Sequence, residues 1–243
     1  MPQRITGHTE LIGLIANPIR NSKSPMMHNT AFEALGLDYV YLVFEVDNST
    51  LKATIDGLRA MKVRGFNVSM PNKGPVLQYL DELTPAAQLC QAVNTVVNED
   101  GKLIGTNTDG LGFMLACKAQ HMDIIGKKIT LLGAGGAATA ICMQAALDGV
   151  AEISIFNGKD AFWEHALQNA ERINSQTNCR AQVFSLEDTD SLRREIEDSV
   201  MLVNATGCGF CQPVGPSLIP DKSYLRSDIM VFDIIYSTLE SQL

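Results

Sequence analysis

The chain has 243 residues, of which 46% are apolar and 19% charged, and 19 Lys and Arg against 27 Asp and Glu give a formal net charge of −8. This length suits one large α/β domain or two smaller ones, and the apolar content argues against intrinsic disorder. A negative chain without a run of Lys or Arg is a poor partner for nucleic acid or an anionic membrane, so we expect a small-molecule ligand.

Short apolar runs alternate with segments of helical length in the first half of the chain. The pattern predicts strands over residues 11–16, 39–46, 65–69, 92–98 and 103–106. It predicts helices over 24–35, 49–61, 73–80 and 109–121, with a further short helix that starts at Thr84-Pro85. Ser24 is the expected N-cap of the first helix, with Pro25 at the first helical position.

A second series of strands and helices begins at Gly126. Strands are predicted over 128–132, 152–156, 181–184, 200–204 and 229–234, and helices over 135–147, 161–175 and 190–198. Strands that alternate with helices imply right-handed crossovers and mainly parallel sheets. We therefore expect an α/β protein of two lobes with a cleft between them, divided between Asp109 and Gly126.

The stretch 129–147 contains nineteen residues without a charge, which is close to the length of a membrane span. Its Gly, Ala, Thr and Gln content favours a buried strand, turn and helix instead. The N-terminus has no apolar core of a signal peptide, and the cysteines are scattered: Cys90, Cys117, Cys142, Cys179, Cys208 and Cys211. We therefore expect reduced thiols and a cytoplasmic protein.

A glycine-rich turn follows the predicted strand 128–132 and opens a helix. It consists of Gly133, Ala134, Gly135, Gly136, Ala137 and Ala138, and it fits the pattern G-x-G-x-x-G/A. In dinucleotide-binding proteins the first glycine permits the turn, the second lets the backbone approach a pyrophosphate, and the last small residue lets helix and strand pack closely. The alternative is a tight turn without a ligand. The strand before and the helix after favour NAD or NADP.

The choice between NAD and NADP is usually made at the end of the next strand, where an acidic residue holds the ribose 2′-hydroxyl. Here Asn157 takes the expected place and Asp160 follows three residues later. Lys159 could attract a 2′-phosphate, but no arginine stands beside it. The segment therefore favours NAD over NADP.

Lys73 and Asp109 are the candidate proton-transfer residues. Each follows a predicted strand and lies at the start of a predicted helix. The positive end of a helix disfavours an ammonium group, so we expect Lys73 to lose its proton more easily than a surface lysine. A Lys–Asp pair in a cleft can move a proton while a hydride moves elsewhere. The alternatives are a solvated lysine and a plain helix cap.

Several polar side chains could bind a small acid. Ser22 and Ser24 lie beside a helix N-terminus, where their hydroxyls could hold a carboxylate, and Asn94 and Thr95 could bond hydroxyl groups. The alternatives are a capping serine with a solvated neighbour and ordinary polar residues of a turn or strand.

Taken together, these segments resemble the shikimate/quinate dehydrogenase family. The matching motifs are SKSP at 22–25, NVSMPNK at 67–73, DELTPAA at 81–87, AVNT at 92–95, NTDG at 107–110 and GAGGAA at 133–138. Their order and spacing fit the family to about residue 160, and more loosely beyond it. The VSM and MPNK forms are more similar to its quinate/shikimate branch.

The resemblance implies a substrate-binding domain over 1–115, a Rossmann-type NAD(P)-binding domain over 116–243, and reversible oxidation of shikimate or quinate to the 3-dehydro acid. It makes Lys73 the catalytic acid/base, oriented by Asp109. It assigns Ser22 and Ser24 to the substrate carboxylate. It assigns Tyr41, Ser69 and Asn94 to ring hydroxyls, and it places Thr206, in the retained N-x-T…G pattern, near the nicotinamide.

Two features depart from the family pattern. Gly158 stands where the family commonly has the arginine for a 2′-phosphate, and Asp160 matches the acid of the NAD-tolerant branch. The sequence ends at Leu243, shortly after Asp233-Ile234-Ile235-Tyr236, where the family's last segment would return to the first domain, so we expect a piece of a longer chain. Cys208 and Cys211 form a single C-x-x-C, too few ligands for a Cys₄ zinc site, and no metal is expected.

Two alternatives stay open at this point. The protein could be a related dehydrogenase of another hydroxy acid, such as an aminoshikimate-type substrate, or an NAD(P)-binding module without catalytic activity. As to partners, we expect a small hydroxy acid, with the protein acting as a monomer or a homodimer.

Overall fold

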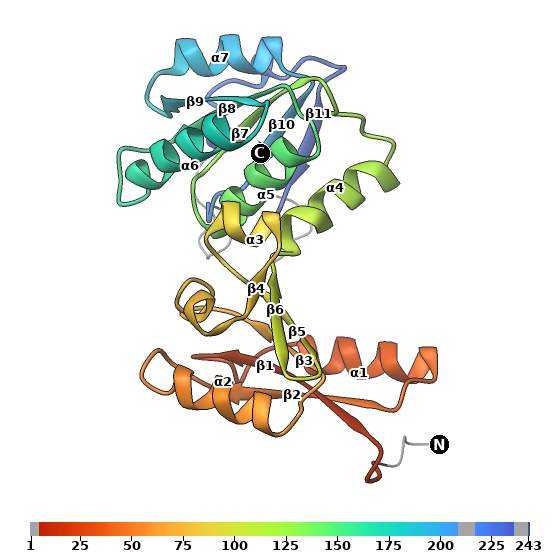
Figure 1. Ribbon diagram of the computed structural model, residues 1–243. Coiled ribbons are helices and arrows are strands. Elements are labelled where there is room, and N and C mark those ends of the chain that lie inside the picture. The colour runs from red at the N-terminus through yellow and green to blue at the C-terminus, as the bar shows by residue number, and fades with distance from the viewer. Residues whose placement is uncertain (1–4, 209–216, 236–242) are drawn as a thin grey trace. The chain divides into compact units, whose positions relative to one another are not determined.

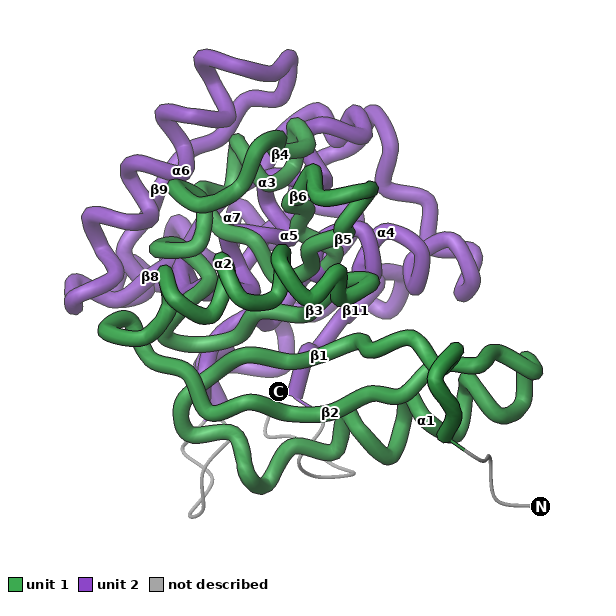
Figure 2. Tube along the Cα trace, turned by 60° about the horizontal axis from the view of Figure 1, so that its bottom comes forward, with its two compact units in different colours: residues 1–108 green, residues 109–243 purple. Residues whose placement is uncertain are grey.

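The computed structural model describes residues 5–208, 217–235 and 243. The chain forms two compact units, Met1–Thr108 and Asp109–Leu243 (Figure 2). We expected the division between residues 115 and 116, whereas the compact units divide before helix α4 (Asp109–Ala119). The reason is that α4 packs along α5 (Gly136–Leu147), where Gly110 lets the two helix backbones approach each other at Ala140.

The first unit contains a six-stranded sheet in the order β2-β1-β3-β5-β6-β4 (Figure 1). Its strands are β1 (Glu10–Ala16), β2 (Tyr39–Glu45), β3 (Gly65–Val68), β4 (Glu82–Leu83), β5 (Thr95–Glu99) and β6 (Lys102–Thr106). Strands β2, β1 and β3 are parallel, as expected, but β5 is antiparallel to both β3 and β6. The β5–β6 pair has a local cause: Asp100 and Gly101 both have positive φ and close a two-residue hairpin, which can join only antiparallel strands.

Helices cover this sheet from both faces. Phe32 of α1 (Ser24–Leu35) packs with Leu14 and Tyr41 on one face. On the other face Ile55 of α2 (Leu51–Ala60) joins Ile15 in the larger core. Neighbours along β1 therefore point into opposite cores, because successive side chains of a strand alternate between its faces.

The short elements of the first unit differ most from the sequence prediction. Residues 73–80 were expected to be a helix, but the structure has a 3₁₀ helix, η1 (Pro75–Tyr79), with Gly74 as its N-cap. Ser24 is the first residue of α1 rather than its N-cap, which is Lys23. The short helix α3 (Pro85–Cys90) begins as predicted, with the Thr84 hydroxyl accepting a hydrogen bond from the Ala87 N–H at 3.4 Å.

The second unit contains a parallel five-stranded sheet in the order β11-β10-β7-β8-β9. Its strands are β7 (Lys128–Leu132), β8 (Glu152–Asn157), β9 (Arg180–Ser185), β10 (Met201–Asn204) and β11 (Met230–Asp233). Besides α4 and α5, the helices are α6 (Trp163–Gln176), α7 (Thr189–Asp198) and the 3₁₀ helix η2 (Lys222–Tyr224). The strand order reverses between β7 and β10, which makes their carboxyl ends a topological switch point.

The uncharged stretch 129–147 is a buried strand, a turn and a helix, as expected. Strand β7 and most of α5 are buried. Within the ranges that the structure describes, none of the helices combines the length and the hydropathy needed to span a membrane.

Candidate functional site

The glycine turn lies at the switch point of the second unit. Gly133 follows β7 with φ +109°, a conformation that L side chains rarely adopt. Its N–H donates a hydrogen bond to the Phe156 carbonyl at 2.7 Å, and a Cβ at this position would lie 2.8 Å from the Ala205 carbonyl oxygen. Gly133 therefore allows the turn to pass between the ends of β8 and β10.

The start of α5 is open to a ligand. Gly135 is the N-cap of α5 and provides no side-chain cap, and a Cβ on Gly135 or Gly136 would meet no atom within 4 Å. Ala137 is exposed, whereas Ala138 is buried beneath the turn. Amide groups at an uncapped helix N-terminus, with open space above two glycines, fit the pyrophosphate of a dinucleotide.

Thr206 lies beside this turn. A Cβ on Gly133 would be 3.1 Å from Thr206 Cγ2. The Thr206 hydroxyl donates to Asn204 Oδ1 at 2.8 Å and accepts from the Cys208 N–H at 3.2 Å. The structure thus brings together the predicted cofactor residues that follow β7 and β10. Cys211 and Tyr236 lie outside the described residues.

The end of β8 carries the three residues predicted to select the cofactor. Asn157 is buried, and its Nδ2 donates to Asp160 Oδ1 at 3.0 Å. The same carboxylate oxygen accepts from the Phe162 N–H at 2.8 Å. Lys159 is exposed, with its Nζ 6.0 Å from the centre of the Trp163 ring. Asp160 is therefore held at the strand end, whereas Lys159 turns to an aromatic face.

Most of the predicted substrate residues of the first unit lie at the start of α1, after the end of β3 and just before β5. Ser22 and Ser24 are half-buried neighbours, and the Ser24 N–H donates to Ser22 Oγ at 3.2 Å. Asn94 Oδ1 accepts from the Thr95 hydroxyl at 2.9 Å and from the Thr108 N–H at 2.9 Å. These contacts fix the Asn94 amide.

Tyr41 was predicted to touch a ring hydroxyl, but it is only 1% exposed. Burial raises the pKa of its phenol to about 12, although a hydrogen bond from Ser24 opposes the shift. The phenol donates to Asn67 Oδ1 at 2.8 Å. Asn67 was missed by the sequence analysis. Its position two residues before Ser69, on the same face of one strand, was the available signal.

Backbone hydrogen bonds anchor the segment from Ser69 to Lys73. The Ser69 N–H donates to the Ile15 carbonyl at 3.0 Å, and the Lys73 carbonyl accepts from the Val93 N–H at 2.8 Å. Lys73 is half-buried. Lys73 precedes Gly74, the N-cap of the five-residue 3₁₀ helix η1, and therefore lies just before this helix instead of starting it.

Asp109 is the first residue of α4 and therefore belongs to the second unit, whereas Lys73 belongs to the first. The preceding residue, Thr108, is bonded to Asn94, and the Asn107 amide donates to the Ala92 carbonyl at 3.2 Å. The chain that leads into Asp109 is thus well anchored. The pairing of Lys73 with Asp109 stays a prediction.

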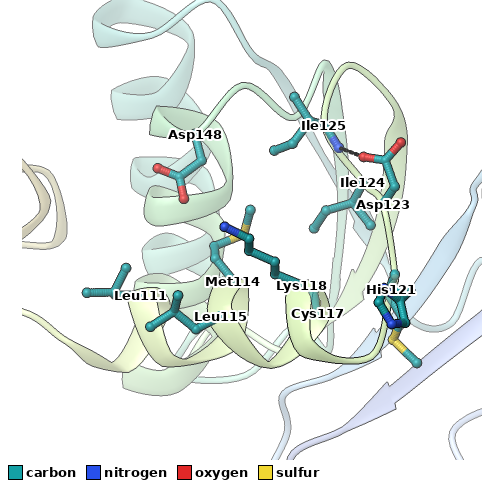
Figure 3. Close-up of a pocket in the computed structure, with 11 residues that line it drawn as sticks. Leu111, Met114, Leu115, Cys117, Lys118, His121, Asp123, Ile124, Ile125 and Asp148 are labelled. Atoms are coloured by element: carbon teal, nitrogen blue, oxygen red, sulfur yellow. Dashed lines mark hydrogen bonds between the residues drawn. The ribbon is translucent and has the colours of Figure 1, made fainter.

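A separate apolar pocket of about 490 Å³ lies in the second unit (Figure 3). Leu111, Leu115 and Lys118 of α4 line it together with Ile125 and Asp148. Asp123 closes one edge, where its Oδ1 accepts from the Ile125 N–H at 3.3 Å. None of the predicted site residues lines this pocket, so it is distinct from the glycine turn.

Comparison with known proteins places these features in one family. Residues 14–96 match the family model of the shikimate dehydrogenase substrate binding domain. The chain is 58% identical over 241 residues to the shikimate dehydrogenase (NADP(+)) of Listeria innocua, a match that spans 99% of this chain and 83% of the relative.

Solved structures show the same similarity. Shikimate 5-dehydrogenase from Listeria monocytogenes, solved in complex with shikimate and NAD, superimposes with a TM-score of 0.97 at 58% identity over 100% of this chain and 84% of that one. Quinate dehydrogenase from Corynebacterium glutamicum, in complex with NAD, superimposes with a TM-score of 0.82 at 27% identity over 96% of this chain and 83% of that one.

Proposed function

The chain belongs to the shikimate dehydrogenase family, and we propose that it oxidises shikimate reversibly to the 3-dehydro acid with NAD or NADP. The observation that carries this proposal is the glycine turn at the switch point of a parallel sheet, joined in one chain to a matched substrate-binding domain. It is an NAD(P)-dependent oxidoreductase.

The first unit supplies the substrate contacts. Ser22 and Ser24 hold the carboxylate of the acid at the start of α1, and Ser69 and Asn94 bond its ring hydroxyls. This assignment is supported by their half-buried hydroxyl and amide groups, which gather on elements of one unit. A site that bonds each hydroxyl discriminates strongly against an analogue that lacks one.

Lys73 handles the proton. In the oxidation it takes the proton of the reacting hydroxyl, and in the reduction it returns that proton to the ketone oxygen. The Asp109 carboxylate orients the Lys73 ammonium and stabilises its charge. When bound, the nicotinamide accepts or donates the hydride at the reacting carbon.

The second unit holds the cofactor. The backbone from Gly133 to Ala138 binds the pyrophosphate, Thr206 lies toward the nicotinamide, and Asn157 and Asp160 face the adenosine ribose. Asp160 favours NAD, because a carboxylate accepts from a 2′-hydroxyl and repels a 2′-phosphate. We place the enzyme in the cytoplasm, where reduced thiols such as the four buried ones persist.

Steady-state kinetics with shikimate and quinate, each against NAD and NADP, tests the proposal. We expect turnover of shikimate with both cofactors and a higher kcat/KM with NAD. A best rate with another hydroxy acid would favour the aminoshikimate-type alternative. Cofactor binding without turnover of any acid would favour the non-catalytic module.

A further inference from the structure

The buried phenol of Tyr41 belongs to a hydrogen-bond network that reaches the candidate substrate residue Asn94. Tyr41 lies on β2, at the edge of the sheet of the first unit, and its hydroxyl donates to Asn67 Oδ1 of β3 at 2.8 Å. Asn67 continues the connection, since its Nδ2 donates to Thr95 Oγ1 at 3.0 Å and to the Asn94 carbonyl at 3.3 Å. A network of hydrogen bonds therefore runs from the Tyr41 hydroxyl to Asn94.

The donor and the acceptor of each hydrogen bond in this network are fixed by chemistry. The Asn94 carbonyl can only accept, so Asn67 must present its NH₂ there and its Oδ1 to Tyr41. Tyr41 must then donate its only hydrogen to Asn67 Oδ1, at 2.8 Å. A phenol meets this need because its O–H is a donor, which a phenylalanine at this position would lack.

The directions of the hydrogen bonds at the Asn94 end of this network are also determined. Having accepted from Asn67, the Thr95 hydroxyl donates to Asn94 Oδ1 at 2.9 Å. The same oxygen accepts from the Thr108 N–H at 2.9 Å. The Asn94 amide is thus oriented with its oxygen toward Thr95 and Thr108, which also fixes the direction in which its NH₂ group points.

His28 holds the Tyr41 ring in place. Its imidazole stacks on the phenol ring with centroids 4.4 Å apart and an angle of 15° between the planes. His28 lies one helical turn after Ser24 on α1, so both side chains project on the same side of the helix. The Tyr41 backbone is fixed as well, because its N–H and C=O both bond the Asn29 side chain, at 2.8 and 3.0 Å.

We propose that Tyr41 is a positioning residue: without touching the substrate, it sets the orientation of Asn94 through its hydrogen bond to Asn67. This inference rests on the proposed function, since it takes Asn94 as a substrate contact. It predicts that the loss of one buried hydroxyl weakens the binding of the acid while the hydride-transfer machinery remains intact.

The test is Tyr41→Phe, which removes the hydroxyl and keeps the ring that stacks on His28. We expect KM for shikimate to rise about tenfold, equivalent to ~1.4 kcal/mol, while kcat and KM for NAD stay within a factor of about three. Tyr39→Phe is the matched control. Tyr39 is two residues away on the same strand, its ring packs edge-on against Phe32, and its substitution should leave all constants unchanged.

Thr95→Val removes a second hydroxyl, at the Asn94 end of the hydrogen-bond network, with little change in side-chain volume. We expect it to raise KM for shikimate alone, and the double variant to show less than the sum of the two effects, because groups in one network couple. Thermal unfolding of each variant reports on the fold separately.

The inference would be overturned if the Tyr41→Phe variant had the same kcat and the same KM for shikimate and NAD as the Tyr39→Phe variant. Additive effects in the double variant, or parallel losses in kcat, NAD binding and melting temperature, would also overturn it, since they indicate a structural role. Wild-type protein that fails to bind shikimate in calorimetry while it binds NADH would overturn the proposed function as well, which distinguishes the two failures.

Discussion

Gly133 and Ala205 bring the ends of β7 and β10 so close that a Cβ on Gly133 would lie 2.8 Å from the Ala205 carbonyl oxygen. The contact joins residues far apart in the sequence at the point where the sheet order reverses. Because ligands of open α/β sheets bind at such points, it relates the stability of the second unit to its capacity to bind a dinucleotide.

Gly133→Ala should therefore destabilise the protein. The side chain would be strained at φ +109° and would clash with backbone, so we expect a loss of about 1–3 kcal/mol in the free energy of unfolding. Urea unfolding measures this loss. Gly135→Ala is the contrasting variant: a Cβ there meets no atom, so stability should hold while NADH binding, followed by fluorescence, weakens. Equal stability losses in the two variants would contradict this account.

Lys73→Ala should abolish most of the turnover. Removing a general acid/base lowers kcat by about 10²–10⁴-fold, whereas NADH binding should remain near that of wild type. Lys52→Ala is the control, since Lys52 is an exposed residue of α2 paired with Asp56 at 2.7 Å. Turnover that is equal in the Lys73 variant and wild type would refute the role assigned to this lysine.

Asp160→Asn should shift the cofactor preference toward NADP. The amide oxygen can still accept from Asn157 and Phe162, so the strand end should keep its geometry while the negative charge is lost. We expect the ratio of kcat/KM for NADP to that for NAD to rise about tenfold, or ~1.4 kcal/mol. Asp148→Asn, a change of equal charge at the end of α5, should leave the ratio unchanged. If the ratio of the two kcat/KM values were unchanged in the Asp160 variant, Asp160 would have no role in the choice of cofactor.

Glu195 should make stability depend on pH at the acid end. Burial alone would raise its pKa, but hydrogen bonds from Lys128, at 2.7 Å, and Ser154 outweigh burial and hold the pKa below its ordinary value. A lowered pKa in the folded state adds stability above the unfolded pKa near 4.5, and this stability is lost as the pH falls through the folded pKa.

Glu195→Gln should then lower the free energy of unfolding by about 1–3 kcal/mol at pH 7, since it leaves the Lys128 ammonium half-buried beside a neutral amide. The difference from wild type should shrink as the pH falls through the lowered folded pKa of Glu195, because the wild-type carboxylate then becomes protonated as well. Urea unfolding at several pH values measures it, with the exposed Glu187→Gln as the control. A constant difference across pH would contradict the assignment.

The order of strands and helices was largely predictable because it depends on residue patterns that are local in the sequence. The strand 128–132 and the helix that ends at Leu147 follow from hydrophobic periodicity and from glycines at the turn. The 3₁₀ helix η1 was predicted as an ordinary helix. Pro75 and the Gly74 N-cap start it late, and it ends after five residues, a length that periodicity does not resolve.

The sequence by itself determined the class of the protein: the glycine turn, the position of Lys73 after a strand, and the motifs that carry the family resemblance all lie within short segments. Only the tertiary structure decided that β10 lies beside β7, that β5 runs against β3, and that Tyr41 is buried and bonded to Asn67. The physical reason is that strand order and burial depend on contacts between distant segments, whereas propensity, turns and motifs depend on neighbours along the chain.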